Sequence, residues 1–110
     1  MSNELLSTAF INLLWMCLED TGVIDKKQSY SGDNIEAAMK EAIRSGQYSK
    51  EYMQKHVDKW LDDAIEETIY KNEERWKEFG FTLDDIEEIV EEDSIEEKTR
   101  AQVMSFIQNI

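Results

Sequence analysis

Residues 5–18 have the sequence LLSTAFINLLWMCL, and this stretch decides the fold class of the chain. Its apolar side chains cover nearly the whole circumference of a helix that we expect to run from about residue 2 to residue 20. A helix that is apolar on every side is buried on all sides or buries its spare face in an oligomer. The apolar run of residues 9–18 is interrupted by Asn12 and is shorter than the ~20 residues of a membrane span. We therefore expect a buried helix.

Helical spacing of apolar residues also recurs in the rest of the chain, which contains no proline and no alternating strand pattern. The expected helices begin near Asp33, Ser49, Thr82 and Ser94. Three of these starts match a capping box, in which two side chains satisfy free backbone amides: Asp33 with Glu36, Thr82 with Asp85, and Ser94 with Glu97. The 110 residues therefore predict one all-α domain, a small bundle of about five helices.

The longest expected helix covers about residues 49–79. A helix of that length spans ~45 Å, whereas a domain of this size has a diameter of ~26 Å. The helix must therefore project, break near Asn72 or pack against a second copy of the chain. We expect Gly80 to end it in a Schellman motif, with Phe81 folding back on the last turn.

The charge of the chain is concentrated in one third of its length. The chain has 25 acidic and 12 basic residues, and its net charge is −13. Residues 62–97 contain 16 acids and only three bases, so they alone account for −13, and the other residues sum to zero. Residues 84–97 contain nine acids and no base. Like charges on a helix repel, so this arrangement opposes stability and creates a directional field.

Such a field predicts a partner of opposite charge, although a surface that is only solvated would have the same composition. It repels phosphate, so direct nucleic-acid binding is disfavoured. Carboxylates spaced along helices can instead imitate a track of phosphates, as in phage-borne inhibitors of nucleases or polymerases, including anti-CRISPR proteins. We therefore expect a non-enzymatic module that docks on a basic protein surface, such as that of a nucleic-acid-binding enzyme, without a cofactor, a metal or a membrane.

The expected contact residues are the acids of this segment and two aromatic side chains among them. They are Asp62, Asp63, Glu66, Glu67, Tyr70, Glu73, Glu74, Trp76, Asp84, Asp85, Glu87, Glu88, Glu91 and Glu92. An aromatic side chain surrounded by charge is typical of an interface anchor.

Two alternatives stay open. The first is a structural module that forms a homodimer through the helices at residues 2–20 and 49–79. The second is a metal-dependent enzyme, because Glu87, Glu88 and Glu91 resemble the first half of the metal motif in the all-α nucleotide pyrophosphohydrolases related to MazG. In that family a second helix supplies a Glu-x-x-Asp motif, which occurs nowhere in this chain.

The lone cysteine and the lone histidine both lie among apolar residues. Cys17 has no basic neighbour in the sequence, so we expect a small buried side chain rather than a nucleophile. His56 lies on the apolar side of its helix, where we expect it to pack. A chain with one cysteine has no disulfide framework, which is consistent with a reducing compartment and a cytoplasmic location.

Overall fold

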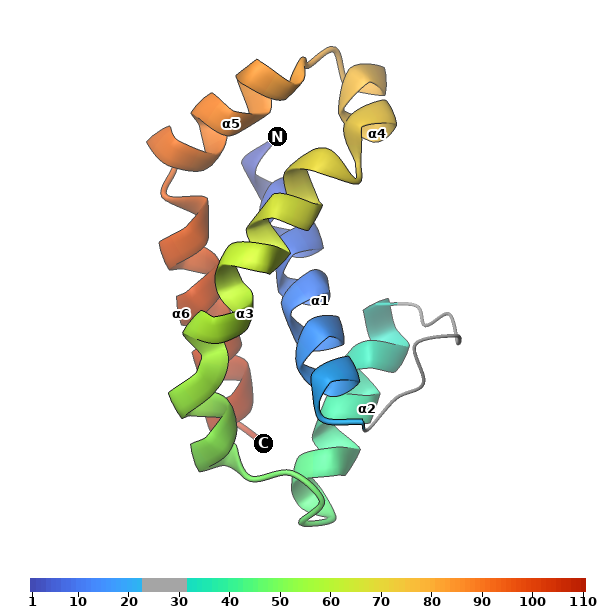
Figure 1. The fold of residues 1–110 in the computed structure, drawn as a ribbon, viewed down its shortest axis with the longest axis vertical. Coiled ribbons are helices and arrows are strands. Elements are labelled where there is room, and N and C mark those ends of the chain that lie inside the picture. Colours follow the sequence, from blue (N-terminus) through green and yellow to red (C-terminus); the bar gives the residue numbers. More distant parts are fainter. Residues whose placement is uncertain (23–31) are drawn as a thin grey trace.

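The structure is a computed structural model that describes residues 1–22 and 32–110, and only the backbone at Gly32 and Asp33. The described residues form six helices and no strand, which confirms the all-α class (Figure 1). The helices are α1 (Ser2–Asp20), α2 (Gly32–Arg44), α3 (Lys50–Tyr70), α4 (Glu73–Glu78), α5 (Leu83–Glu92) and α6 (Ile95–Gln108). The capping box predicted at Asp33 lies outside the described side chains. No helix in this part of the chain has the length and apolar character that a membrane crossing requires.

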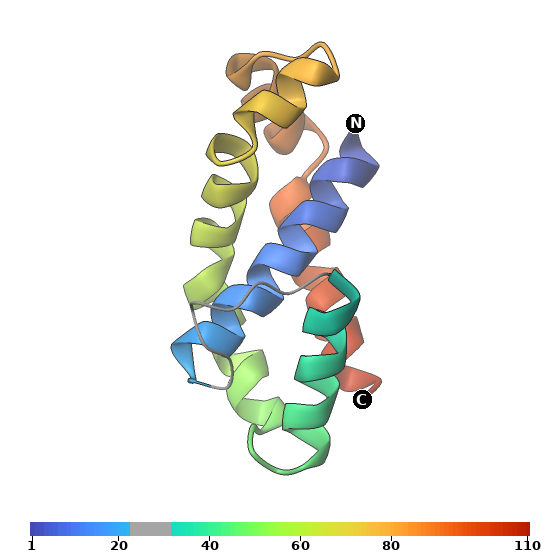
Figure 2. The ribbon, with the colours of Figure 1, turned by 90° about the vertical axis from the view of Figure 1, so that its right-hand side faces the viewer.

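Helix α1 lies at the centre of the bundle. It packs against α3, α6, α2 and α5, and in Figure 2 it crosses diagonally between α3 on one side and α2 and α6 on the other. Its buried side chains are Leu5, Ala9, Phe10, Leu13, Leu14, Cys17 and Leu18. Packing within the chain therefore covers much of the apolar circumference of α1, whereas Leu6, Ile11, Trp15 and Met16 of the same helix are only partly buried.

The long helix predicted over residues 49–79 is broken, because α3 ends at Tyr70. The last carbonyls of a helix have no partner within it, and here two side chains beyond the helix end supply the donors. The Asn72 amide donates to the carbonyls of Glu67 (3.3 Å) and Thr68 (3.2 Å). The buried Trp76 indole N–H donates to the Thr68 carbonyl at 2.9 Å. Of the three alternatives for this segment, the break near Asn72 is the one that occurs.

Local signals set the turn between α4 and α5 as predicted. Gly80 has φ 88°, a left-handed conformation that glycine adopts without a steric penalty. The Phe81 N–H donates to the Trp76 carbonyl at 2.9 Å and the Gly80 N–H to the Lys77 carbonyl at 2.9 Å, which is a Schellman motif. Thr82 then starts α5 with its capping box formed.

The capping box predicted at Ser94 is wrong. An N-cap residue needs extended backbone for its side chain to reach the helix amides, but Ser94 has φ 51° and ψ 46° and makes no side-chain cap bond. Only two residues separate α5 from α6, and the left-handed conformation of Ser94 makes this sharp turn.

The break and the two turns place α4 and α5 at one end of a molecule that measures 43 × 27 × 20 Å. Helix α5 lies across this end and contacts α6, α3, α1 and α4. The start of α1 lies at the same end, whereas α2 and the C-terminus lie towards the other (Figures 1 and 2).

Substitution of Trp76 tests whether its side chain stabilises the fold at the break between α3 and α4. Trp76→Phe removes one of the donors to the Thr68 carbonyl and leaves a void, so we expect it to lower the free energy of unfolding by about 2–4 kcal/mol. Urea denaturation measures this loss. Phe79→Leu at the end of the same helix is the control, because Phe79 is half-exposed. Equal losses in the two variants would contradict a structural role for Trp76.

Candidate functional site: the acidic end

Residues 62–97, called the acidic end below, form the second half of α3, all of α4 and α5, and the start of α6. These elements come together in the half of the molecule that contains α4 and α5 (Figure 1). In contrast, residues 32–61 contain five acids and five bases. The fold therefore keeps the net charge on one part of the surface and leaves α2 and the first half of α3 balanced.

The three bases of the acidic end are engaged near the break between α3 and α4. Lys71 pairs with Glu67 at 2.5 Å, and Lys77 pairs with Glu73 at 3.3 Å. The Arg75 guanidinium donates to the Thr8 hydroxyl at 3.0 Å and lies 5.0 Å from the centre of the Trp76 ring. None of these bases forms an ion pair with α5 or α6.

The carboxylates of residues 84–97 are consequently left without a counter-ion. Among the described residues, no lysine, arginine or terminal amine lies within 4.0 Å of any of these nine carboxylates. The ion pair of Arg100 is with Asp58 of α3 and lies outside this segment. Within the described residues, ion pairs therefore do not balance the negative charge of α5 and of the start of α6.

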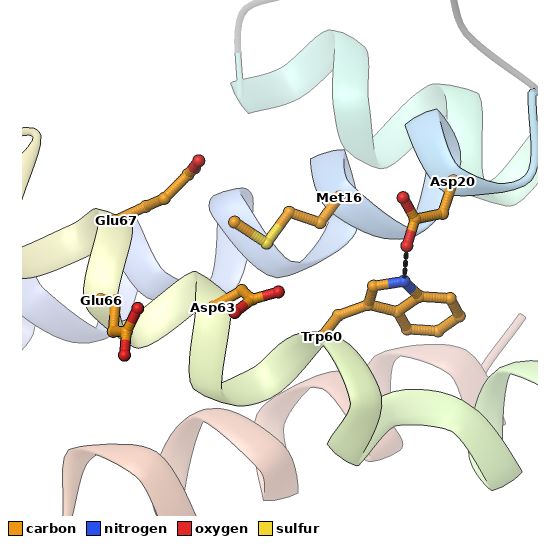
Figure 3. A pocket seen from close by; sticks show the side chains of 6 residues that line it. All are labelled: Met16, Asp20, Trp60, Asp63, Glu66 and Glu67. Atoms are coloured by element: carbon orange, nitrogen blue, oxygen red, sulfur yellow. Dashed lines mark hydrogen bonds between the residues drawn. The ribbon is translucent and has the colours of Figure 1, made fainter.

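One groove at the acidic end runs between α1 and α3 (Figure 3). Asp63 points into the space beside Met16, and the Trp60 indole N–H donates to Asp20 at one end of the groove. The full lining is Met16, Asp20, Trp60, Asp63, Glu66 and Glu67. The predicted residues Asp63, Glu66 and Glu67 thus meet here, together with Asp20 and Met16, which the sequence did not indicate because they belong to α1.

Helix α5 presents carboxylates on two sides. Glu87 and Glu91 line a groove against α6, together with Glu96 and Glu97. The other side lines a second groove, formed by Gly80, Phe81, Asp85, Glu88, Ile89 and Glu92. The acids therefore surround this end of the bundle and do not form a single flat face.

Several acids of the acidic end have structural roles. Asp85 accepts from the Thr82 N–H at 3.0 Å in the capping box, and these bonds lower the pKa of Asp85. Glu87 accepts from the hydroxyl of Tyr70, and this bond raises the pKa of Tyr70. Asp93 accepts from the hydroxyl of Ser2 at the start of α1. The predicted contact residues on α5 that have no such role are Asp84, Glu88, Glu91 and Glu92.

The two predicted aromatic anchors differ in their exposure. Tyr70 is 51% exposed, as a surface anchor must be. Trp76 is fully buried in the core, so its assignment as a contact residue is corrected. Phe79, three residues after Trp76, is 50% exposed beside the α4–α5 turn. Trp76 and Phe79 are three residues apart, so their spacing alone places both side chains on the same side of a helix. This spacing therefore does not predict that Trp76 is buried and Phe79 is exposed.

Neighbouring carboxylates raise the pKa values of two glutamates at the acidic end, Glu92 and Glu96. Glu88, one turn before Glu92 on α5, raises the pKa of Glu92 above its ordinary value. The pKa of Glu96 is raised by a hydrogen bond with Asp62 of α3, by partial burial and by the charge of Asp58. These groups destabilise the free protein when they are charged.

The three acids that resemble half of a metal motif lie on two sides of α5. Among the described residues, no three His, Cys, Asp or Glu side chains are placed to hold a metal ion. Glu88 lines a different groove from Glu87 and Glu91, so the three acids that resemble half of a metal motif do not converge.

The lone cysteine and histidine pack as the sequence predicted. The buried Cys17 thiol donates to the Tyr48 hydroxyl at 3.1 Å, and burial raises the pKa of Cys17 to about 12. The half-buried ring of His56 packs between Tyr52, whose ring centre is 4.2 Å away, and Trp60.

The fold and the site define a small all-α domain with one unneutralised acidic end. No protein family, curated protein or solved structure matches the chain.

The dependence of stability on pH tests whether repulsion among the carboxylates of the acidic end lowers the free energy of unfolding. The raised pKa values of Glu92 and Glu96 mean that the folded state binds these protons more tightly than the unfolded chain. Stability should therefore increase as pH falls towards their ordinary value of 4.5. The pKa values of Asp85 and Glu4 are lowered by hydrogen bonds from backbone amides, so the stability from these groups is lost at still lower pH.

We expect the melting temperature to rise between about pH 7 and about pH 5 and to fall below about pH 4. Circular dichroism melts at constant ionic strength measure this profile. A melting temperature that falls steadily from neutral pH would show that repulsion at the acidic end does not limit stability.

Proposed function

We propose that this protein binds a partner protein through its acidic end and that the contact surface of the partner is basic. The observation that carries the proposal is the set of nine carboxylates in residues 84–97, for which no base of the described chain provides a counter-ion. Arginine and lysine side chains from a partner would supply the missing charge and relieve the repulsion at Glu92 and Glu96.

The partner that fits this surface best is a nucleic-acid-binding protein. Its binding site is built to hold closely spaced negative charges, and carboxylates along α3, α5 and the start of α6 present such charges. Bound there, this chain would occupy the place of the nucleic acid and act as an inhibitor or competitor. The division of the molecule into a charged end and a balanced half supports this assignment, because it orients the acidic end towards a basic surface during encounter.

An arginine-rich probe of the protamine type, which naturally covers DNA phosphates, tests this proposal. We expect the fluorescently labelled probe to bind in a salt-dependent way. Glu88→Gln with Glu91→Gln, which neutralises two α5 carboxylates without structural roles, should weaken binding at least about threefold. Glu41→Gln with Glu51→Gln removes the same charge from exposed positions in the balanced half and should have little effect.

Two outcomes would contradict the proposal. Equal weakening in the two double variants would mean that only total charge matters and that the acidic end is no binding surface. Binding that survives high salt and both substitutions would mean that the contact lies elsewhere. Duplex DNA added as a competitor should displace this protein from the probe, because both occupy the same cationic groups.

A further inference from the structure

The groove between the α4–α5 turn and α5 combines an apolar floor with an acidic rim. Phe81 and Ile89 provide the floor and are both only partly buried, so they expose apolar surface in the free protein. Exposed apolar surface that is bordered by charge is typical of an interaction site.

The rim of this groove contains two carboxylates that are free to bind. Asp85 is held by Thr82, but Glu88 and Glu92 have no ion pair among the described residues. They are four residues apart on α5, so they lie one above the other on the same side of the helix, ~6 Å apart along its axis. Glu88 raises the pKa of Glu92, first through its charge and then through a hydrogen bond between the two side chains.

We propose that this groove docks a basic amphipathic helix of the partner. Its apolar side chains pack on Phe81 and Ile89, and two of its lysines or arginines, one helical turn apart, pair with Glu88 and Glu92. This inference rests on the proposed function and specifies which part of the acidic end recognises the partner and what kind of segment it recognises.

The carboxylates and the apolar side chains of the groove together favour a basic amphipathic helix over other segments. An apolar segment without cations would cover Glu88 and Glu92 and leave both carboxylates buried without ion-pair partners. Burial of unpaired charges costs free energy. A basic segment without an apolar face would leave the floor exposed and would bind the groove against α6, which also has carboxylates, equally well. Two cations at the spacing of one helical turn match the spacing of the two glutamates.

The experiment uses two synthetic peptides of the same composition, leucine and lysine in equal number over about 18 residues. One has the spacing of an amphipathic helix, and in the other the order is scrambled. We expect the full-length protein to bind the amphipathic peptide about tenfold more tightly in fluorescence anisotropy titrations. Glu88→Gln with Glu92→Gln should remove most of that preference.

The matched control neutralises two exposed carboxylates of the other groove, Glu91→Gln with Glu97→Gln. Because these acids belong to the acidic end, the control should weaken the binding of both peptides alike and leave the preference between them unchanged. All four positions are exposed, so both variants are expected to fold, which their circular dichroism spectra verify.

Equal binding of the two peptides, with equal weakening in both double variants, would overturn the groove assignment while leaving the acidic end as a general cation-binding surface. Binding that neither double variant weakens would overturn both this inference and the proposed function. A stronger effect of the Glu91 and Glu97 substitutions would move the docking site to the groove against α6 and contradict the assignment made here.

Discussion

The hydrogen bond from the Trp76 indole to the Thr68 carbonyl is the contact on which the architecture depends. Thr68 is buried, its hydroxyl donates to the Ala64 carbonyl, and it accepts from the Asn12 amide of α1, so this residue joins α1, α3 and α4. Trp76 enters the core where α3 has ended, and its bond to Thr68 holds α4 at the end of α3. Helix α5 consequently lies across the end of the bundle, next to α6 and the start of α1.

The same turn separates the bases of the acidic end from most of its acids. Lys71, Arg75 and Lys77 all lie close to the break and are engaged with Glu67, with Thr8 and Trp76, and with Glu73. No base follows until Lys98, so α5 and the first turn of α6 are left negative. The apolar core around α1 provides the stability that tolerates this repulsion. The like charges of the acidic end therefore lower the stability of the free chain.

Features that depend on neighbouring residues could be predicted from the sequence, whereas features that depend on distant contacts could not. The bounds of α1, the stop at Gly80 and the cap at Thr82 follow from local patterns, and the charge of residues 62–97 can be counted directly. The burial of Trp76 and the exposure of Phe79 depend on the contact with Thr68, and the contribution of Asp20 and Met16 depends on how α1 packs against α3. The separation of the α5 acids into two grooves depends on where α4 and α6 lie.

One end of the folded molecule has a negative charge that described bases do not neutralise, whereas α2 and the first half of α3 are balanced. The near-surface electrostatic potential at each backbone amide tests this difference and is obtained by NMR from the relaxation that cationic and anionic paramagnetic cosolutes cause. We expect strongly negative potentials at residues 80–97 and potentials much closer to zero in α2 and the first half of α3. Similar potentials over the whole surface would contradict this expectation.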